Sequence, residues 1–203
     1  MNVGFISLGC SKNLVVTEEI IGLFKKHNFN IVTDEKDADI LIINTCGFIE
    51  SAKKEAIDTI LEMAEYKKDK CKYLIVVGCL VGRYKDELVK LLPEVDLFIS
   101  IKEYPLLWEK INMLINNKLS TDNLDFHKRY ITTGNITAYL KIAEGCSNGC
   151  TYCAIPLIQG KYVSRDFDDI IKEAKELASK GYQELIVIAQ DTGKYGYDLY
   201  GRN

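Results

Sequence analysis

Three cysteines that lie close together in the sequence have the clearest capacity for chemistry. Cys146, Cys150 and Cys153 are separated by three residues and then by two. Thiolates are soft ligands that suit zinc and iron-sulfur clusters. A structural or electron-carrying site normally takes four protein ligands, so three thiolates from one loop predict a cubic iron-sulfur cluster in which one iron has no protein ligand. A small molecule can bind at that iron.

This spacing, with Tyr152 directly before the last cysteine, resembles the signature of the radical S-adenosylmethionine enzymes. In those enzymes the open iron of a 4Fe-4S cluster chelates the amino and carboxylate groups of S-adenosyl-L-methionine. The residues alone leave open a zinc knuckle, or a ferredoxin-like loop whose fourth cysteine lies elsewhere. The stretch 138–142 predicts a short strand that leads into the loop. In parallel barrels the active site lies at the C-terminal ends of the strands.

A second set of cysteines is spread over the first part of the chain. Cys10, Cys46 and Cys79 each come at or just after the C-terminal end of a predicted strand. In a parallel sheet these ends share one edge, where open α/β folds bind ligands, so we expect the three thiols to converge and hold a second cluster. The alternative is an α/β binding domain with incidental thiols, because free cysteines are common as small buried hydrophobic residues. Cys71 precedes its strand and is expected about 26 Å from Cys79, at about 3.3 Å per residue, so we do not count it as a ligand.

The elements that must position these cysteines follow an α/β pattern. Short apolar runs alternate with amphipathic stretches, which predicts a parallel sheet covered by helices. Apolar residues at helical spacing predict helices around residues 16–24, 57–64 and 107–114. We therefore predict an N-terminal doubly wound, Rossmann-like parallel sheet domain over residues 1–118. Its strands are predicted at residues 3–7, 30–32, 40–44, 73–77 and 97–99.

The remainder of the chain predicts a connector and a second unit. Residues 119–135 lack a clear period and are rich in turn formers, which is typical of a linker. Residues 136–203 contain a strand, the cysteine loop, an amphipathic helix and a strand at 184–188, which is the order expected at the start of a radical SAM (β/α) barrel. Two strands and one helix cannot close a barrel. We expect either a longer protein that continues beyond residue 203, or a truncated product whose second unit is poorly ordered and inactive alone.

Composition and charge narrow the possible partners. The 203 residues carry a net charge of -3, which gives no overall basic field for nucleic acid. The chain does not begin with a secretory signal, and no apolar run approaches the length of about 20 residues that spans a membrane. We predict a cytoplasmic protein with no membrane partner. Seven cysteines in such a chain suggest metal ligands or reactive thiols rather than a disulfide framework.

With both sets of cysteines placed, the sequence resembles the methylthiotransferase family of radical S-adenosylmethionine enzymes. Within the family it is most similar to the members that modify an aspartate of a small-subunit ribosomal protein. The members that modify tRNA usually have Gln-Met-Asn after the first cysteine, whereas this chain has Ser11, Lys12 and Asn13. The resemblance covers nearly the whole chain and is carried by residues 7–15, 44–49, 92–96, 143–146, 153–156 and 189–192.

The sequence departs from the family pattern at three positions. Val16 stands where the family tends to have Asp, and Gln159 and Val163 stand where it tends to have Arg. Glutamine and valine do not replace a guanidinium as a charge partner. The two substitutions near the cysteine loop therefore remove fixed donors for a carboxylate of S-adenosyl-L-methionine or of the substrate.

The resemblance implies two 4Fe-4S clusters and S-adenosyl-L-methionine as cofactors. The cluster at Cys146, Cys150 and Cys153 would pass an electron, from a donor such as flavodoxin or ferredoxin, into S-adenosyl-L-methionine. The resulting 5'-deoxyadenosyl radical would take a hydrogen from the β-carbon of the ribosomal aspartate. The other cluster, at Cys10, Cys46 and Cys79, would supply a methylated sulfur. The rival hypotheses are tRNA as the substrate and a non-catalytic module that binds clusters without cleaving the cofactor.

Three further residues are candidates for contacts with the cofactor, and no residue is assigned a catalytic role. Tyr152 is predicted to form a wall or a hydrogen bond at the adenine, with packing of the loop as the alternative. Gln190, at the C-terminal end of a barrel strand, is predicted to contact polar groups of the cofactor. Arg165 is predicted to hold a carboxylate, with a solvated surface salt bridge as the alternative.

Overall fold

A five-stranded parallel sheet forms the first part of the computed structural model, which describes residues 1–116 and 122–201. All five strands were predicted, with ends that differ by at most one residue, and they run in the order β2-β1-β3-β4-β5. Residues 119–121 of the predicted connector and residues 202–203 lie outside the described residues. The strands are β1 (Asn2–Ser7), β2 (Asn30–Val32), β3 (Ile40–Thr45), β4 (Tyr73–Gly78) and β5 (Leu97–Ser100).

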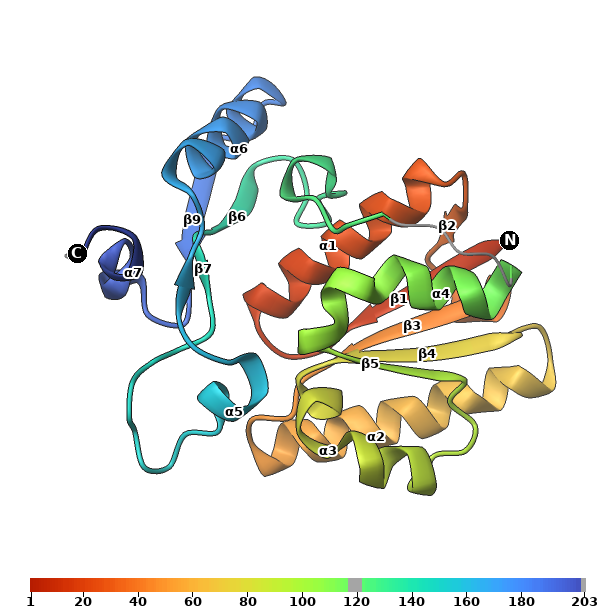
Figure 1. Ribbon diagram of the computed structural model, residues 1–203. Helices are drawn as coiled ribbons and strands as arrows, with labels where there is room; N and C mark the ends of the chain where they lie inside the picture. The colour runs from red at the N-terminus through yellow and green to blue at the C-terminus, as the bar shows by residue number, and fades with distance from the viewer. Residues whose placement is uncertain (117–121, 202–203) are drawn as a thin grey trace.

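Helices cover both faces of this sheet (Figure 1). The side chains of β3 alternate between the two faces, so that Ile40 and Ile42 pack on one side while Leu41 and Ile43 pack on the other. All six residues of β3 are buried, as expected for a parallel strand between two helical layers. The predicted doubly wound α/β fold is confirmed. One layer contains α1 (Ser11–Lys26) and α4 (Leu107–Asn116), and the other contains α2 (Glu50–Glu65) and α3 (Cys79–Leu91).

The second unit begins with a β-α-β arrangement. Strands β6 (Thr137–Lys141) and β9 (Glu184–Ile188) pair in parallel, and α6 (Phe167–Ser179) connects them, as predicted for the start of a barrel. Two successive apolar side chains of β9 are partly uncovered, with Ile186 38% and Val187 49% exposed. The sequence did not predict four shorter elements, which are β7 (Ala143–Glu144), α5 (Ile155–Gln159), β8 (Val163–Ser164) and α7 (Tyr197–Tyr200).

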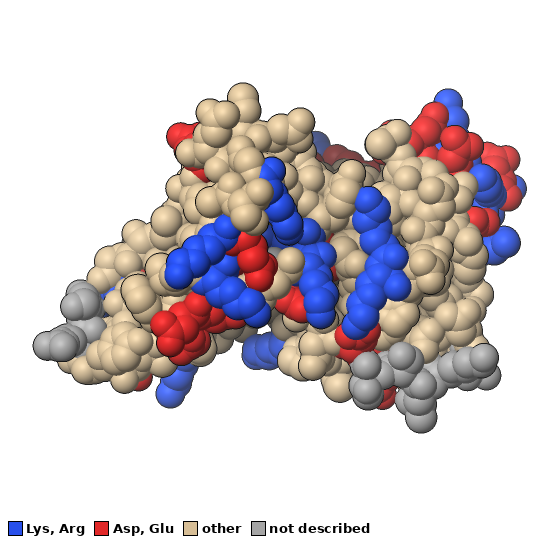
Figure 2. Space-filling model, turned by 90° about the horizontal axis from the view of Figure 1, so that it is seen from above, with Lys and Arg blue, Asp and Glu red and all other residues tan. Residues whose placement is uncertain are grey.

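Short 3-10 helices complete the described chain, and no helix within its two described ranges is long and apolar enough to cross a bilayer. The side of the molecule that carries α6 and α1 shows basic and acidic side chains intermixed (Figure 2). This mixture provides no large field of one sign. The 3-10 helices are η1 (Glu35–Asp37), η2 (Tyr66–Lys68), η3 (Ile101–Leu106), η4 (Phe126–Lys128) and η5 (Thr192–Lys194).

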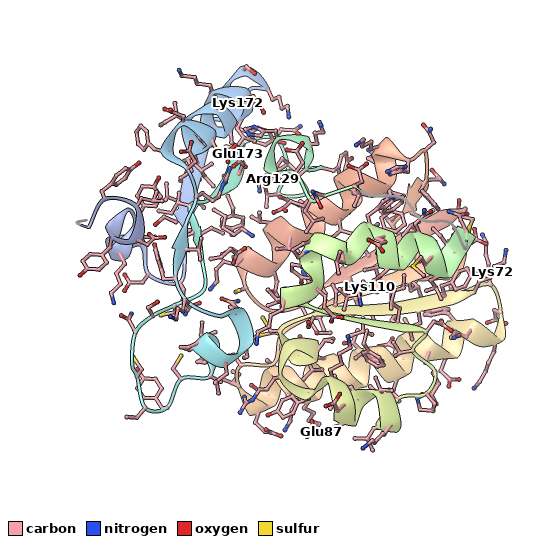
Figure 3. The ribbon with its side chains drawn as sticks, in the orientation of Figure 1. Lys72, Glu87, Lys110, Arg129, Lys172 and Glu173 are labelled. Atoms are coloured by element: carbon pink, nitrogen blue, oxygen red, sulfur yellow. The ribbon has the colours of Figure 1, made fainter. Side chains whose placement is uncertain are left out.

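A buried group of charges joins the two units. Nη1 of Arg129 lies 3.0 Å from Oε2 of Glu18 in α1, and Nη2 lies 3.1 Å from Oε1 of Glu173 in α6. All three side chains are at most 2% exposed. Glu18 also accepts hydrogen bonds from the backbone and hydroxyl of Thr132. Figure 3 shows Arg129 beside Glu173, between α6 and α1. We refer to Glu18, Arg129 and Glu173 as the Arg129 cluster, which anchors the predicted connector.

A neighbouring carboxyl makes the stability of the protein sensitive to pH. Burial raises the pKa of Glu19 to about 7 from its ordinary 4.5, although Lys141 and Arg129 act in the opposite direction and Glu144 and Glu173 add to the increase. Between these two pKa values the folded chain binds more protons than the unfolded chain, so stability decreases as the pH rises through this range. We expect the free energy of unfolding of the parent to fall by about 2 kcal/mol between about pH 5 and about pH 8, relative to Glu19→Gln.

Urea unfolding of both proteins at several pH values measures this difference. The Glu19→Gln variant serves as the control because its amide does not titrate in this range. Parallel stability curves for the two proteins would show that Glu19 is not the source of the pH dependence.

Candidate cluster-binding site

The three separated cysteines lie around one cavity at the carboxyl edge of the sheet. Cys10, Cys46 and Cys79 follow β1, β3 and β4, and all three line a cavity of about 410 Å³. Gly9 has a φ of +91°, and a Cβ atom there would lie 3.1 Å from Sγ of Cys46, so the loop before Cys10 passes very close to that thiol. Cys71 precedes β4 and therefore lies toward the other edge. The structure thus brings the three thiols together, while their role as cluster ligands stays a prediction.

The donor set around this cavity consists of three thiols, and thiolates are ligands of both iron-sulfur clusters and zinc. Within residues 1–116 and 122–201, no group of three or more His, Cys, Asp or Glu side chains is arranged to hold one metal ion. A single zinc ion needs all of its thiolates within about 2.3 Å of one point. A cubic iron-sulfur cluster instead offers a different iron to each thiolate, so its ligands stand farther apart.

Buried polar side chains hold together the strand ends that carry these cysteines. Nδ2 of Asn13 donates hydrogen bonds to the backbone oxygens of Leu8, at 3.0 Å, and of Thr45, at 3.1 Å. Nδ2 of Asn44 donates to the backbone oxygen of Asn13 at 2.8 Å, and the Thr45 hydroxyl donates to that of Val77 at 2.7 Å. None of Asn13, Asn44 and Thr45 was predicted to have a role. Asn44 and Thr45 are polar residues at the end of the apolar strand β3, which was the available signal, whereas Asn13 lies in α1.

The Cys79 thiol is the most deeply buried of the three. Burial, followed by the nearby Cys46 and Cys10 thiols, raises its pKa to about 11, although Gln159 and Lys12 act in the opposite direction. Because a metal ligand must be a thiolate, ligand binding at Cys79 is coupled to the loss of its proton. Nε2 of Gln159 lies 3.7 Å from the Cys79 sulfur, and its Oε1 is buried with no hydrogen-bond partner among the described residues.

The second set of cysteines lies on the loop between β7 and α5. Its sulfurs differ in environment, because the first is buried, the second exposed and the third half-buried, in the order Cys146, Cys150 and Cys153. The amide of Cys146 donates to the backbone oxygen of Gly160 at 3.2 Å, and Nδ2 of Asn148 donates to Oδ2 of Asp191 at 3.0 Å. Asp191 follows β9. The loop is thus tied to the C-terminal end of a barrel strand, where the sequence analysis expected it.

The helix α5 connects the loop of the second set to the cavity of the first. Its residues Ile155 and Gln159 line the cavity that Cys10, Cys46 and Cys79 share. Ile155 comes two residues after Cys153, so their Cα atoms are at most about 7.6 Å apart. The end of the loop that carries Cys153 therefore lies near the cavity of the first set.

Comparisons with known proteins show which proteins this chain is similar to. The family described as uncharacterized protein family UPF0004 matches residues 2–100, and the radical SAM superfamily matches residues 140–202. A protein from Alkaliphilus oremlandii named ribosomal protein uS12 methylthiotransferase RimO is 68% identical over 99% of this chain and 46% of its own length. Proteins of the same name from Clostridium kluyveri and Caldicellulosiruptor saccharolyticus are 52% and 50% identical, over 100% and 98% of this chain and 47% and 48% of their own lengths.

The chain is similar to the first half of these methylthiotransferases, and its second part matches the radical SAM superfamily. It spans slightly less than half the length of the curated relatives that it matches. The resemblance inferred from the cysteine motifs is confirmed, including its similarity to the uS12-modifying members.

Two of the three residues predicted to contact the cofactor, Tyr152 and Gln190, lie in different environments. Tyr152 is 85% exposed and is absent from the described residues that line the cavity. Gln190 lines the cavity, and its Oε1 accepts a hydrogen bond from the Lys12 ammonium of the sheet domain. Both cofactor roles stay predictions, and only Gln190 lies beside the thiols of the first set.

Arg165 is held by acidic side chains of α6. Its Nη1 lies 2.6 Å from Oε2 of Glu173 and also donates to the backbone oxygen of Lys141, while Asp169 pairs with Nη2. The Arg165 side chain is 8% exposed, while its partner Asp169 is 39% exposed and its partner Glu173 is 2% exposed. Its predicted contact with a carboxylate of the cofactor is not tested by this arrangement.

The three departures from the family pattern lie in different environments. Val16 is buried in the core between α1 and the sheet, whereas Val163 of β8 is 59% exposed. Gln159 lines the cavity and contacts Cys79 of the first set. The substitution of Arg by Gln therefore affects the cavity of the first set, and not only the loop of the second.

Proposed function

We propose that this chain provides the two cluster sites of a radical S-adenosylmethionine methylthiotransferase that acts on ribosomal protein uS12. The observation that carries the proposal is a cavity lined by Cys10, Cys46 and Cys79 and by residues of α5, the helix that directly follows the loop of the second set. An enzyme that both generates a radical and delivers a sulfur needs two neighbouring cofactor sites. Support comes also from relatives named ribosomal protein uS12 methylthiotransferase RimO. The proposed modification adds a methylthio group to the β-carbon of an aspartate.

In this proposal each set of cysteines holds one 4Fe-4S cluster, and Gln190 orients polar groups of S-adenosyl-L-methionine. The bound cofactors supply the radical and the methylthio sulfur. The protein supplies position and shields the reaction from water. Phe48, Ile155 and Val187 form apolar walls of the cavity and are suited to that shielding. We further propose an external one-electron donor such as flavodoxin or ferredoxin, and the cytoplasm as the compartment, since ribosomes are found there.

Replacement of the first set of cysteines, with the second set left intact, tests the proposal. The protein is reconstituted anaerobically and incubated with dithionite, S-adenosyl-L-methionine and a uS12 peptide. We expect the parent to form 5'-deoxyadenosine and a methylthiolated peptide. We expect the variant Cys10→Ala, Cys46→Ala, Cys79→Ala to keep forming 5'-deoxyadenosine but to lose the methylthiolated product by about 100-fold or more, because its sulfur-delivering site is gone.

Cys71→Ala is the matched control, because this thiol is buried but lies away from the cavity. It should retain both products. An unchanged yield of methylthiolated peptide from the triple variant would contradict the proposed role of the first set. Methylthioadenosine in tRNA, in place of a modified aspartate, would assign the chain to the tRNA-modifying members of the family.

A further inference from the structure

One cation faces the cavity between the two units. The described residues that line this cavity are thiols, apolar side chains and neutral polar side chains, with Lys12 as the one formally charged member. Lys12 lies in the first turn of α1, two residues after Cys10. Its Cα atom is therefore at most about 7.6 Å from that of Cys10. Any negatively charged group that enters the cavity meets this ammonium beside the first set of cysteines.

The present partner of Lys12 is neutral. Its Nζ donates a hydrogen bond to Oε1 of Gln190, which belongs to the second unit. No carboxylate of the described residues forms an ion pair with Lys12. By contrast, Arg129 is paired with two buried carboxylates. An amide oxygen is a weaker acceptor for an ammonium than a carboxylate, so an incoming acid can replace Gln190 with a gain in hydrogen-bond strength.

We propose that Lys12 is a specificity-determining residue that binds the side-chain carboxylate of an aspartate in a polypeptide substrate. This inference rests on the proposed function and adds the residue that recognises the modified side chain. The carbon to be modified is directly bonded to that carboxylate. An ammonium that holds the carboxylate therefore also holds the β-carbon near the first set of cysteines.

The surroundings of Lys12 favour this ligand over a nucleic acid. Phe48, Ile155 and Val187 give the cavity apolar walls, while the Lys12 ammonium itself is accessible from the solvent. Recognition of a phosphate backbone normally uses several Lys and Arg side chains, whereas this cavity offers one. A neutral nucleobase has no negative charge for the ammonium to bind. A single carboxylate matches the single cation.

Binding of two peptides that differ in one charge tests the inference. A fluorescently labelled uS12 peptide with its native aspartate is compared with the same peptide carrying Asn, using anisotropy and the cluster-reconstituted protein. We expect the parent to bind the Asp peptide about 10-fold or more tightly than the Asn peptide, as one charge-assisted hydrogen bond implies. In Lys12→Met the ratio should fall to about 1, and Lys12→Arg should retain most of the preference because it keeps the charge.

Lys90→Met provides the matched control, since Lys90 is an exposed residue of α3 that does not line the cavity. It should behave like the parent. Equal binding of both peptides by the parent, or no binding of either, would overturn the inference whether or not the variants fold. The inference is also wrong if Lys12→Met keeps the parental ratio, or if the substitution weakens binding of a tRNA anticodon stem-loop and not of the peptide.

The binding ratio also separates this inference from the proposed function. A parent that prefers the Asp peptide through Lys12 but yields no methylthiolated product would leave the recognition role intact and refute the reaction. Iron content and thermal unfolding of each variant, measured alongside, report whether the substitution has damaged the fold.

Discussion

The combined substitution of Cys146, Cys150 and Cys153 by alanine is expected to abolish the formation of 5'-deoxyadenosine from S-adenosyl-L-methionine and to remove roughly half of the reconstituted iron. The loop that carries these residues contributes all the thiols of its set, so the variant retains no ligand of that cluster. Methylthiolation of the uS12 peptide should disappear as well, because no radical is generated. Quantification of the nucleoside by liquid chromatography, together with iron and zinc analysis, measures the effect.

The triple variant of the first set is the appropriate comparison, because it removes the same number of thiols from the same protein. It should lose a similar amount of iron and yet continue to cleave the cofactor. If the loop variant also continued to form 5'-deoxyadenosine, these cysteines would not be the radical-generating ligands. A parent that binds zinc in place of iron at this loop would favour the zinc knuckle considered from the sequence.

Arg129→Ala is expected to lower the free energy of unfolding by about 3 to 5 kcal/mol, the typical cost of removing one partner from a buried ion pair. The substitution leaves the carboxylates of Glu18 and Glu173 buried, at most 2% exposed, without their shared cation. Because these carboxylates belong to α1 and α6, their repulsion acts directly on the contact between the two units. Urea unfolding, followed by circular dichroism, measures the loss.

Lys128→Ala is the matched control, since it is the preceding residue and also forms an ion pair. Nζ of Lys128 lies 3.1 Å from Oδ2 of Asp125, but the lysine side chain is 66% exposed. Exposed pairs contribute about 0 to 1 kcal/mol, so this variant should differ little from the parent. Similar losses for both variants would indicate that burial of the Arg129 cluster does not determine its contribution.

The sheet was predictable because its strands carry a simple pattern. β3 has an unbroken apolar run of a kind that occurs between two helical layers, and turn-forming residues bound each strand. The position of the cysteines then followed from topology, because parallel strands place their carboxyl ends at one edge. The approach of Cys10, Cys46 and Cys79 to one cavity required no information beyond strand direction and order.

The parts that were not predicted depend on contacts between distant segments. Arg129 lies in a stretch without periodicity, and its two carboxylate partners are 111 and 44 residues away in sequence, so no local pattern indicates that it is buried. The short elements β7, β8 and α5 contain from two to five residues, too few for a period to be recognised. The Lys12 contact with Gln190 joins residues 178 apart and is equally invisible locally.

Because the Arg129 cluster is buried, its charges should respond to salt differently from the charge of Lys12. Mobile ions of the solvent screen charges that they can approach, and they reach a fully enclosed pair much less. The attraction between Arg129 and the carboxylates of α1 and α6 should therefore depend little on ionic strength. The ammonium of Lys12 borders an open cavity, so mobile ions can approach it and screen its charge.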